Sequence, residues 1–146
     1  MVLAIIADVL QIVVFPYEEK MSLTERNRAV VQRFVELFYA QKNVRLAFET
    51  CVAEDYVQHN PGILDGREAA IVALEPMFSR PDSRFDVKRI LVDGDLAAVH
   101  LHGKSAGSEA GGAVVDLFRL ENGLIVEHWD VLQPIPANPI NPHPMF

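Results

Sequence analysis

The sequence predicts one α+β domain, with three helices followed by an antiparallel sheet. Apolar residues recur at helical spacing through about residue 78, and the period changes to 2 from Arg84 onward. Two favoured hairpin dipeptides, Asp93-Gly94 and Asn122-Gly123, divide the second half into two pairs of strands. Helices that precede an antiparallel meander pack on one face of it, so we expect a curved sheet covered on one side.

The helices are predicted at residues 23–41, 43–51 and 65–78. The first begins at a capping box, SLTE, that starts at Ser22, and Asn43 can cap the second. Cys51 lies on the apolar face of the second helix, and we interpret it as a small buried hydrophobe. Capping-box spacing recurs from Asp65 at the start of the third helix. Residues 54–65 show no periodicity and contain a Pro-Gly pair, which predicts a loop.

The strands are predicted at residues 84–92, 96–105, 113–120 and 124–132. A stretch rich in Gly, Ser and Ala, residues 105–112, connects the two hairpins. Five of the nine prolines lie in residues 134–146, so we expect this tail to run extended over the surface and not to enter the sheet.

Residues 1–20 are predicted to be an extension outside the domain at 21–146. The apolar run in this segment is interrupted by Asp8 and Gln11 and is too short for a membrane span. It also lacks the basic region and cleavage site of a signal peptide. One alternative is an extra strand or helix docked on the domain or at a subunit contact. Another is an upstream start, with the natural beginning at Met21.

Composition excludes several kinds of partner. The net charge is −7 and no basic run occurs, which argues against nucleic acids and against anionic membrane surfaces. The chain has a single cysteine and cannot form an internal disulfide, so we expect a reducing, cytoplasmic location. It contains no HExxH, CxxC, P-loop or GxGxxG motif, and we expect neither a metal nor a cofactor.

Titratable side chains alternate with apolar ones on the last three strands. His100 and His102 share one side of their strand, Asp116 and Phe118 one side of the next, and His128 and Asp130 one side of the last. A His or Asp among large apolar residues is costly unless it is paired or used. Each group has a structural alternative: solvated histidines, an Asp116–Arg119 pair, or a buried His128–Asp130 ion pair. Turn or capping chemistry is the corresponding alternative for His59 and Asn60 in the predicted loop.

Several segments together resemble a known family. The loop YVQHNPGILDGREA, the hairpin VVDLFRLENGLIVEHWDVLQPIP and the terminal PMF resemble the SnoaL-like polyketide cyclase family of the nuclear-transport-factor-2-like (NTF2-like) superfamily. The resemblance runs from about residue 21 to 146. It implies a cone in which a strongly curved antiparallel sheet wraps around helices, with an internal pocket for a small-molecule ligand. It also implies a homodimer formed through the outer face of the sheet.

The resemblance further implies cofactor-free acid–base chemistry. Asp130 is the first candidate for the acid or base, and Asp116 is the second. His128 is expected to orient or polarise a carbonyl group. The residues expected to contact the substrate are His59, Asn60, His100, His102 and Phe118. Removal of a proton next to a carbonyl needs a base whose pKa is raised toward neutrality, and burial of a carboxylate has that effect.

Three classes of function therefore remain open. The chain is expected to be an enzyme acting on a small polyketide-like carbonyl compound, by cyclisation or, in the same fold, by isomerisation or hydrolysis. A non-catalytic binding module would keep the pocket but tolerate loss of either carboxylate. An interaction protein would instead have a filled interior, and a cavity of a few hundred Å³ beside Asp130 separates it from the other two.

Overall fold

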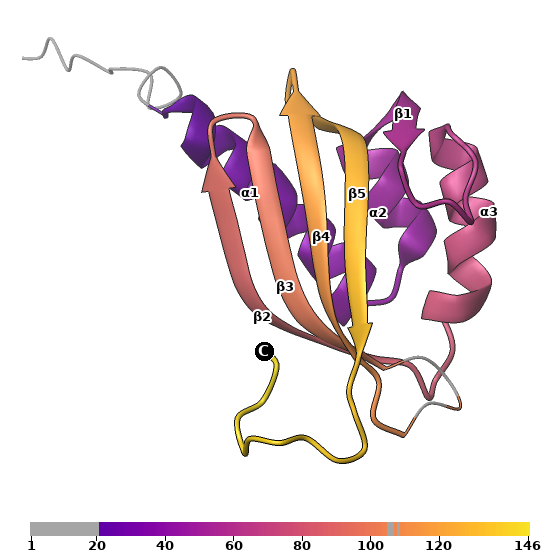
Figure 1. The fold of residues 1–146 in the computed structure, drawn as a ribbon. Helices are drawn as coiled ribbons and strands as arrows, with labels where there is room; N and C mark the ends of the chain where they lie inside the picture. The colour runs from indigo at the N-terminus through magenta and orange to yellow at the C-terminus, as the bar shows by residue number, and fades with distance from the viewer. Residues whose placement is uncertain (1–20, 105–106, 108) are drawn as a thin grey trace, which may run out of the picture.

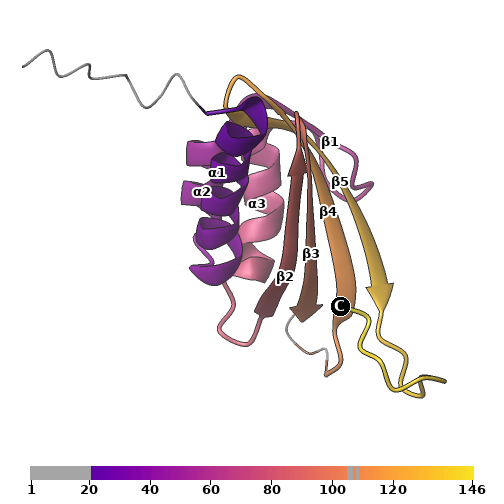
Figure 2. The same cartoon turned by 90° about the vertical axis from the view of Figure 1, so that its left-hand side faces the viewer.

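The computed structural model describes residues 21–104, 107 and 109–146, so the extension expected at residues 1–20 lies outside it. Within the described residues, helices cover one face of a five-stranded sheet (Figures 1 and 2). The predicted α+β class is confirmed. The helices are α1 (Leu23–Val35), the π-helical turn η2 (Glu36–Ala40), α2 (Val44–Cys51) and α3 (Arg67–Phe78). The strands are β1 (Val52–Gln58), β2 (Arg84–Asp93), β3 (Leu96–Lys104), β4 (Gly112–Glu121) and β5 (Leu124–Pro134).

Local capping signals set the starts of α1 and α2. The hydroxyl of Ser22 accepts a hydrogen bond from the Glu25 N–H, and the Glu25 carboxylate accepts one from the Ser22 N–H, as the capping box predicts. Asn43 caps α2 through the Leu46 N–H. The cap expected at Asp65 is wrong. Its carboxylate accepts a hydrogen bond from the Gln58 N–H in β1 instead, and α3 begins after Gly66.

The π-helical turn η2 changes which residues of the first helical segment face inward. The Gln41 N–H donates to the Glu36 carbonyl, one residue further back than in an α-helix. Leu37, Phe38 and Tyr39 are consequently all buried, although three consecutive residues of a regular helix would not share a face. Tyr39 reaches the interior because of this extra residue.

The sheet has the order β1-β5-β4-β3-β2 and is mixed, not purely antiparallel. Strands β2 to β5 form the predicted antiparallel meander, whereas β1 pairs in parallel with β5. Strand β1 includes residues 54–58, which belong to the segment that we predicted as a loop. It is a short edge strand, and its Glu54 and Asp55 hide the apolar alternation that marks the others. Bulges in the β2–β3 and β4–β5 pairings help to bend the sheet.

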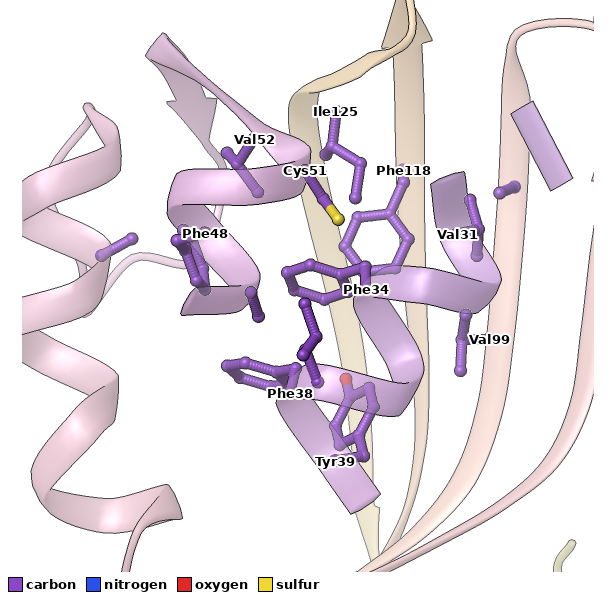
Figure 3. Packing of buried hydrophobic residues seen from close by; sticks show 14 of the residues in the cluster. Val31, Phe34, Phe38, Tyr39, Phe48, Cys51, Val52, Val99, Phe118 and Ile125 are labelled. Atoms are coloured by element: carbon purple, nitrogen blue, oxygen red, sulfur yellow. The ribbon is translucent and has the colours of Figure 1, made fainter. Parts of the chain in front are cut away.

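The core lies between the helices and the inner face of the sheet. Aromatic rings dominate it, with the ring of Phe34 centred 5.0 Å from Phe38 on the same helical segment and 5.5 Å from Phe118 on β4. Figure 3 shows these rings together with Phe48 of α2, opposite the strand residues. Cys51 is buried in this cluster as predicted, and burial raises the pKa of its thiol.

Among the described residues, no helix covers the outer face of the sheet (Figure 2). Strand β5 extends to Pro134, which pairs with Gly112, so the first residue of the expected tail lies in the sheet. The remaining residues, 135–146, form neither helix nor strand, and the last of them lies beside β3. There the ring of Phe146 stacks on His102 with centroids 4.4 Å apart. No helix in the described part of the chain is long and apolar enough to cross a membrane.

Candidate active site

A cavity of about 560 Å³ lies between the helices and the inner face of the sheet. Its walls are mainly apolar and aromatic, and they come from the helical segments and from inward-facing positions of all five strands. None of the described residues that line it is a lysine or an arginine. Its wall includes six phenylalanines: Phe34, Phe38, Phe48, Phe78, Phe85 and Phe118. The volume is in the range of small-molecule sites.

The polar groups of this cavity are concentrated where β4 and β5 pair. The antiparallel register sets Asp116 opposite Asp130 and Phe118 opposite His128. One ligand atom each from Asp116, His128 and Asp130 lies within 4.8 Å of the others. Asp116 is only 6% exposed and His128 9%, so both groups depend on protein partners for their hydrogen bonds.

His128 is held at both ring nitrogens. Its Nε2 lies 3.2 Å from Oδ1 of Asp116, and its Nδ1 lies 2.9 Å from Oε1 of Gln58. The same Gln58 oxygen accepts a hydrogen bond of 2.9 Å from the Asn60 N–H. A backbone N–H can only donate, so the Gln58 atom between the two groups is the oxygen and Nδ1 must carry a proton. The contact between Nε2 and the Asp116 carboxyl group is a hydrogen bond when a second proton lies between these two atoms.

Two buried tyrosines complete this network. The hydroxyl of Tyr39 donates a short hydrogen bond to Oδ2 of Asp116. Gln58 Nε2 donates to the hydroxyl oxygen of Tyr56 at 3.3 Å. Burial, followed by the charge of Asp116, raises the pKa of both phenols above the ordinary value of 10.0. Both tyrosines therefore remain protonated at neutral pH and can act as donors.

Asp130 lies beside this network and has a partner on the loop that follows β1. The side-chain amide of Asn60 donates to its Oδ2 at 2.5 Å. The loop is itself anchored, because the Asn60 amide oxygen accepts from the Gly62 N–H and the Gly66 N–H donates to the Tyr56 carbonyl. Asn60 thus orients the Asp130 carboxylate from a fixed position.

The structure brings together five of the eight predicted site residues: Asn60, Asp116, Phe118, His128 and Asp130. It does not bring the remaining three histidines into the cavity. His59 bonds to Glu127 at 2.8 Å and stacks on Trp129, both of which point to the outer face. The pairing of β1 with β5 ends at His128 and turns the His59 ring to that side.

His100 and His102 also lie on the outer face, which corrects their predicted contact with a ligand in the cavity. His100 bonds to Arg89, and His102 bonds to the Ala110 carbonyl. The reason is the alternation of β3, whose larger apolar residues Val99 and Leu101 are buried against the helices. His100 instead borders a second hollow, between the outer face and the tail.

A divalent metal ion could also be held by Asp116, His128 and Asp130, since two carboxylates and an imidazole offer suitable ligand atoms. Both oxygens of Asp116 already have protein partners. Oδ2 accepts from the Tyr39 hydroxyl, and Oδ1 contacts Nε2 of His128, the nitrogen that would ligate the ion. A metal would have to replace these contacts.

Sequence reasoning missed three residues of this site: Tyr39, Tyr56 and Gln58. Tyr39 lies next to the apolar stripe of its helix and turns inward only because of η2. Tyr56 and Gln58 belong to the strand that we predicted as a loop. The alternation of Tyr56 and Gln58 with exposed Asp55 and Val57 was the available signal for that strand.

Comparison with known proteins agrees with this architecture. The profile of the SnoaL-like domain family matches residues 31–128. A search of curated protein sequences finds no significant match. TsrD from Streptomyces laurentii is similar in structure, with 26% identity over 72% of this chain and 89% of that chain and a TM-score of 0.58.

Two further solved structures share the fold. An NTF2-like protein from Mesorhizobium loti has 24% identity over 77% of this chain and 95% of that chain, with a TM-score of 0.66. A protein from Jannaschia sp. CCS1 that is named a SnoaL-like polyketide cyclase has 23% identity over 77% and 89% of the two chains, with a TM-score of 0.61. The expected NTF2-like fold is therefore confirmed.

Proposed function

The chain belongs to the SnoaL-like domain family, and from this premise we propose that it catalyses enolisation of a small carbonyl compound in the cavity described above. The enolate would then react by aldol-type cyclisation, as expected from the resemblance to polyketide cyclases. The single observation that carries the proposal is the position of Asp116 and Asp130. They face each other across β4 and β5 in the wall of a mainly apolar and aromatic cavity, with a ligand atom of His128 within 4.8 Å of both carboxylates.

The groups divide into a base and an acid. Asp130 is the proposed base, because its only described protein partner is the Asn60 amide, which leaves carboxylate lone pairs free to accept a proton. Asp116 and His128 are the proposed acid, because a proton between Nε2 and Asp116 would be available to a substrate in addition to the one on Nδ1. As the α-proton moves to Asp130, the proton between Nε2 and Oδ1 of Asp116 would turn from this contact to the oxygen of the forming enolate and stabilise it.

The lining of the cavity also favours a substrate that carries no negative charge. Two carboxyl groups line it and, among the described residues, no lysine or arginine does. A carboxylate or phosphate on the substrate would be desolvated without a cationic partner, which is unfavourable. We therefore propose an uncharged, flat substrate whose carbonyl end meets the polar groups and whose remainder contacts the phenylalanine rings.

The test is hydrogen–deuterium exchange at the α-carbon of a panel of uncharged β-dicarbonyl compounds, followed by mass spectrometry. We expect exchange with wild type and a loss of roughly 10²–10⁴-fold with Asp130→Asn, the range for removal of a positioned base. Asp116→Asn should also reduce exchange, whereas Asp93→Asn, which changes an exposed carboxylate, should not. Product analysis with active compounds then distinguishes cyclisation from isomerisation, because both begin with the same enolate.

A binding module is the second candidate, because the same cavity would hold an uncharged ligand without turnover. This function is indicated if the folded protein binds panel compounds, exchanges none of their α-protons, and retains its affinity in Asp130→Asn. In that case the proposed chemistry is wrong, although the proposed ligand class still holds.

We further propose that the protein is a cytoplasmic homodimer that associates through the outer face of the sheet. In the described part of the chain this face has no helical cover and exposes apolar side chains, including Leu91, Leu117 and Val131, the last 63% exposed. Val131→Asp should convert the dimer to a monomer in light scattering coupled to size exclusion. Val72→Asp, at a comparably exposed position on α3, should leave the dimer intact. A wild-type monomer at micromolar concentration would contradict the proposal.

A further inference from the structure

The side chain of Gln58 makes three hydrogen bonds and is almost fully buried. Its oxygen accepts from the Asn60 N–H and from His128 Nδ1, each at 2.9 Å. Its amide nitrogen donates to the hydroxyl oxygen of Tyr56. The backbone N–H of Asn60 fixes which end of the amide is the oxygen, so the direction of all three bonds follows.

We propose that Gln58 is a positioning residue that sets the proton positions of two groups lining the cavity. It holds a proton on Nδ1 of His128, so the mobile proton is the one between Nε2 and Asp116. It also occupies an acceptor position of the Tyr56 oxygen, so the phenol hydrogen is directed away from Gln58. The inference rests on the proposed function in one respect: the ligand group that Tyr56 would contact is taken to be a carbonyl oxygen.

The direction of the Tyr56 hydrogen follows from its surroundings. Tyr56 lines the cavity and is 2% exposed, and no described residue accepts a hydrogen bond from its hydroxyl. A buried O–H without an acceptor is unfavourable, and a ligand oxygen in the cavity would remove that cost. Tyr56 would then be a second donor to the carbonyl oxygen, besides the pair of Asp116 and His128.

Two substitutions at Gln58 separate the two effects. In Gln58→Met the side chain keeps a similar length but loses all three hydrogen bonds. A neutral His128 should then move its proton to Nε2, where the Asp116 carboxylate accepts it. In Gln58→Glu the introduced carboxylate can still accept from Nδ1 and from Asn60, but it cannot donate to Tyr56. The phenol should turn its hydrogen toward that carboxylate, away from the cavity, while His128 keeps its proton on Nδ1.

The tautomer is measured directly by nitrogen-15 NMR of protein labelled in the histidine rings. We expect Nδ1 of His128 to be protonated in wild type and in Gln58→Glu, and Nε2 alone to be protonated in neutral His128 of Gln58→Met. His59, on the outer face, is the internal reference and should not change. An unprotonated Nδ1 in wild type, or the same tautomer in wild type and Gln58→Met, would overturn the inference for His128. This readout requires no turnover, so it can fail or succeed independently of the exchange experiment.

The Tyr56 part is tested by binding of 2-acetylnaphthalene and of 2-ethylnaphthalene, which has the same ring but no carbonyl. Wild type should prefer the ketone, and Gln58→Glu and Tyr56→Phe should each weaken ketone binding about tenfold, as expected for one hydrogen bond to a buried acceptor. Affinity for the hydrocarbon should stay the same in all three proteins. No ketone preference in wild type, or equal ketone affinity in wild type and Gln58→Glu, would overturn this part.

Discussion

Replacement of Tyr39 by Phe should destabilise the protein at neutral pH and make it less sensitive to alkali. Both effects come from the hydroxyl group, which is buried and donates to the Asp116 carboxylate. The substitution keeps the ring, which packs between Phe38 and Phe85. Core packing is therefore conserved, and the change reports on the hydroxyl alone.

The expected loss at neutral pH follows from the acceptor that remains. Asp116 keeps its contact with His128 but loses a donor at Oδ2. Loss of one hydrogen bond to a buried charged group lowers the free energy of unfolding by roughly 1–3 kcal/mol. We expect the free energy of unfolding of Tyr39→Phe to be about 2 kcal/mol below that of wild type.

The alkaline effect has the opposite sign. Burial and the charge of Asp116 raise the pKa of Tyr39 in the folded protein well above its ordinary value of 10.0. Below pH 10.0 the phenol is protonated in both states and the stability is unaffected. Above it the unfolded chain releases the proton and the folded protein does not, so wild type loses about 1.4 kcal/mol per pH unit for this tyrosine.

Urea unfolding followed by circular dichroism, repeated from neutral pH upward, measures both effects. The difference between wild type and Tyr39→Phe should be constant up to pH 10.0 and then shrink, reaching zero at roughly pH 11.5 from the sum of the two effects. Cys51→Ala is the control. The raised thiol pKa makes the free energy of unfolding of wild type decline from about pH 9.0. This decline should be absent in Cys51→Ala, whereas the decline caused by Tyr39 should remain. A wild-type-minus-Tyr39→Phe difference that does not change with pH would refute the reasoning.

Two further outcomes are expected. Gly111 has φ +76° and a Cβ added there would lie 2.3 Å from the Gly103 carbonyl oxygen, whereas a Cβ on Gly123, φ +79°, would meet nothing within 4 Å. Gly123→Ala should lower the free energy of unfolding by approximately 1 kcal/mol, and Gly111→Ala by clearly more. Urea titrations measure both losses, and equal losses would contradict this expectation. His59→Ala should raise the pKa of Glu127 toward its ordinary 4.5, measured by carbon-13 NMR, because the His59 hydrogen bond is the largest cause of its lowering; binding in the cavity should stay unchanged, since His59 lies outside it.

The helices and the meander could be predicted from the sequence because their signals are local. The capping box at Ser22, the hairpin dipeptides and the period-2 strands all lie within a few residues of the structure they specify. The opposition of Asp116 and Asp130 does not follow from the Asn122-Gly123 hairpin alone, because continued hairpin pairing would set Asp116 opposite Trp129. The bulge between Arg119 and Leu120 shifts the register and brings Asp130 opposite Asp116, and no local signal in the sequence indicated it.

The rest of the site depends on contacts between distant residues. Tyr39 lies 77 residues from Asp116, and Gln58 lies 70 residues from His128. A single sequence contains no record of which residues meet over such separations. Alternation groups His100 with His102 but does not say which face is covered. The greater size of Val99 and Leu101 compared with Ala98 was the physical clue that the histidines point outward.

The parallel pairing of β1 with β5 has a consequence for synthesis of the chain. Strand β1 leaves the ribosome directly after α2, but its partner is the last strand to be made. Until β5 emerges, Gln58 and Asn60 have neither His128 nor Asp130 to bond, and the polar end of the cavity cannot be assembled. Helices and β2–β3 can form as local units during translation, whereas the site is completed only in the final step. Truncated nascent chains that stop before β5 should therefore show helical structure without a protected cavity.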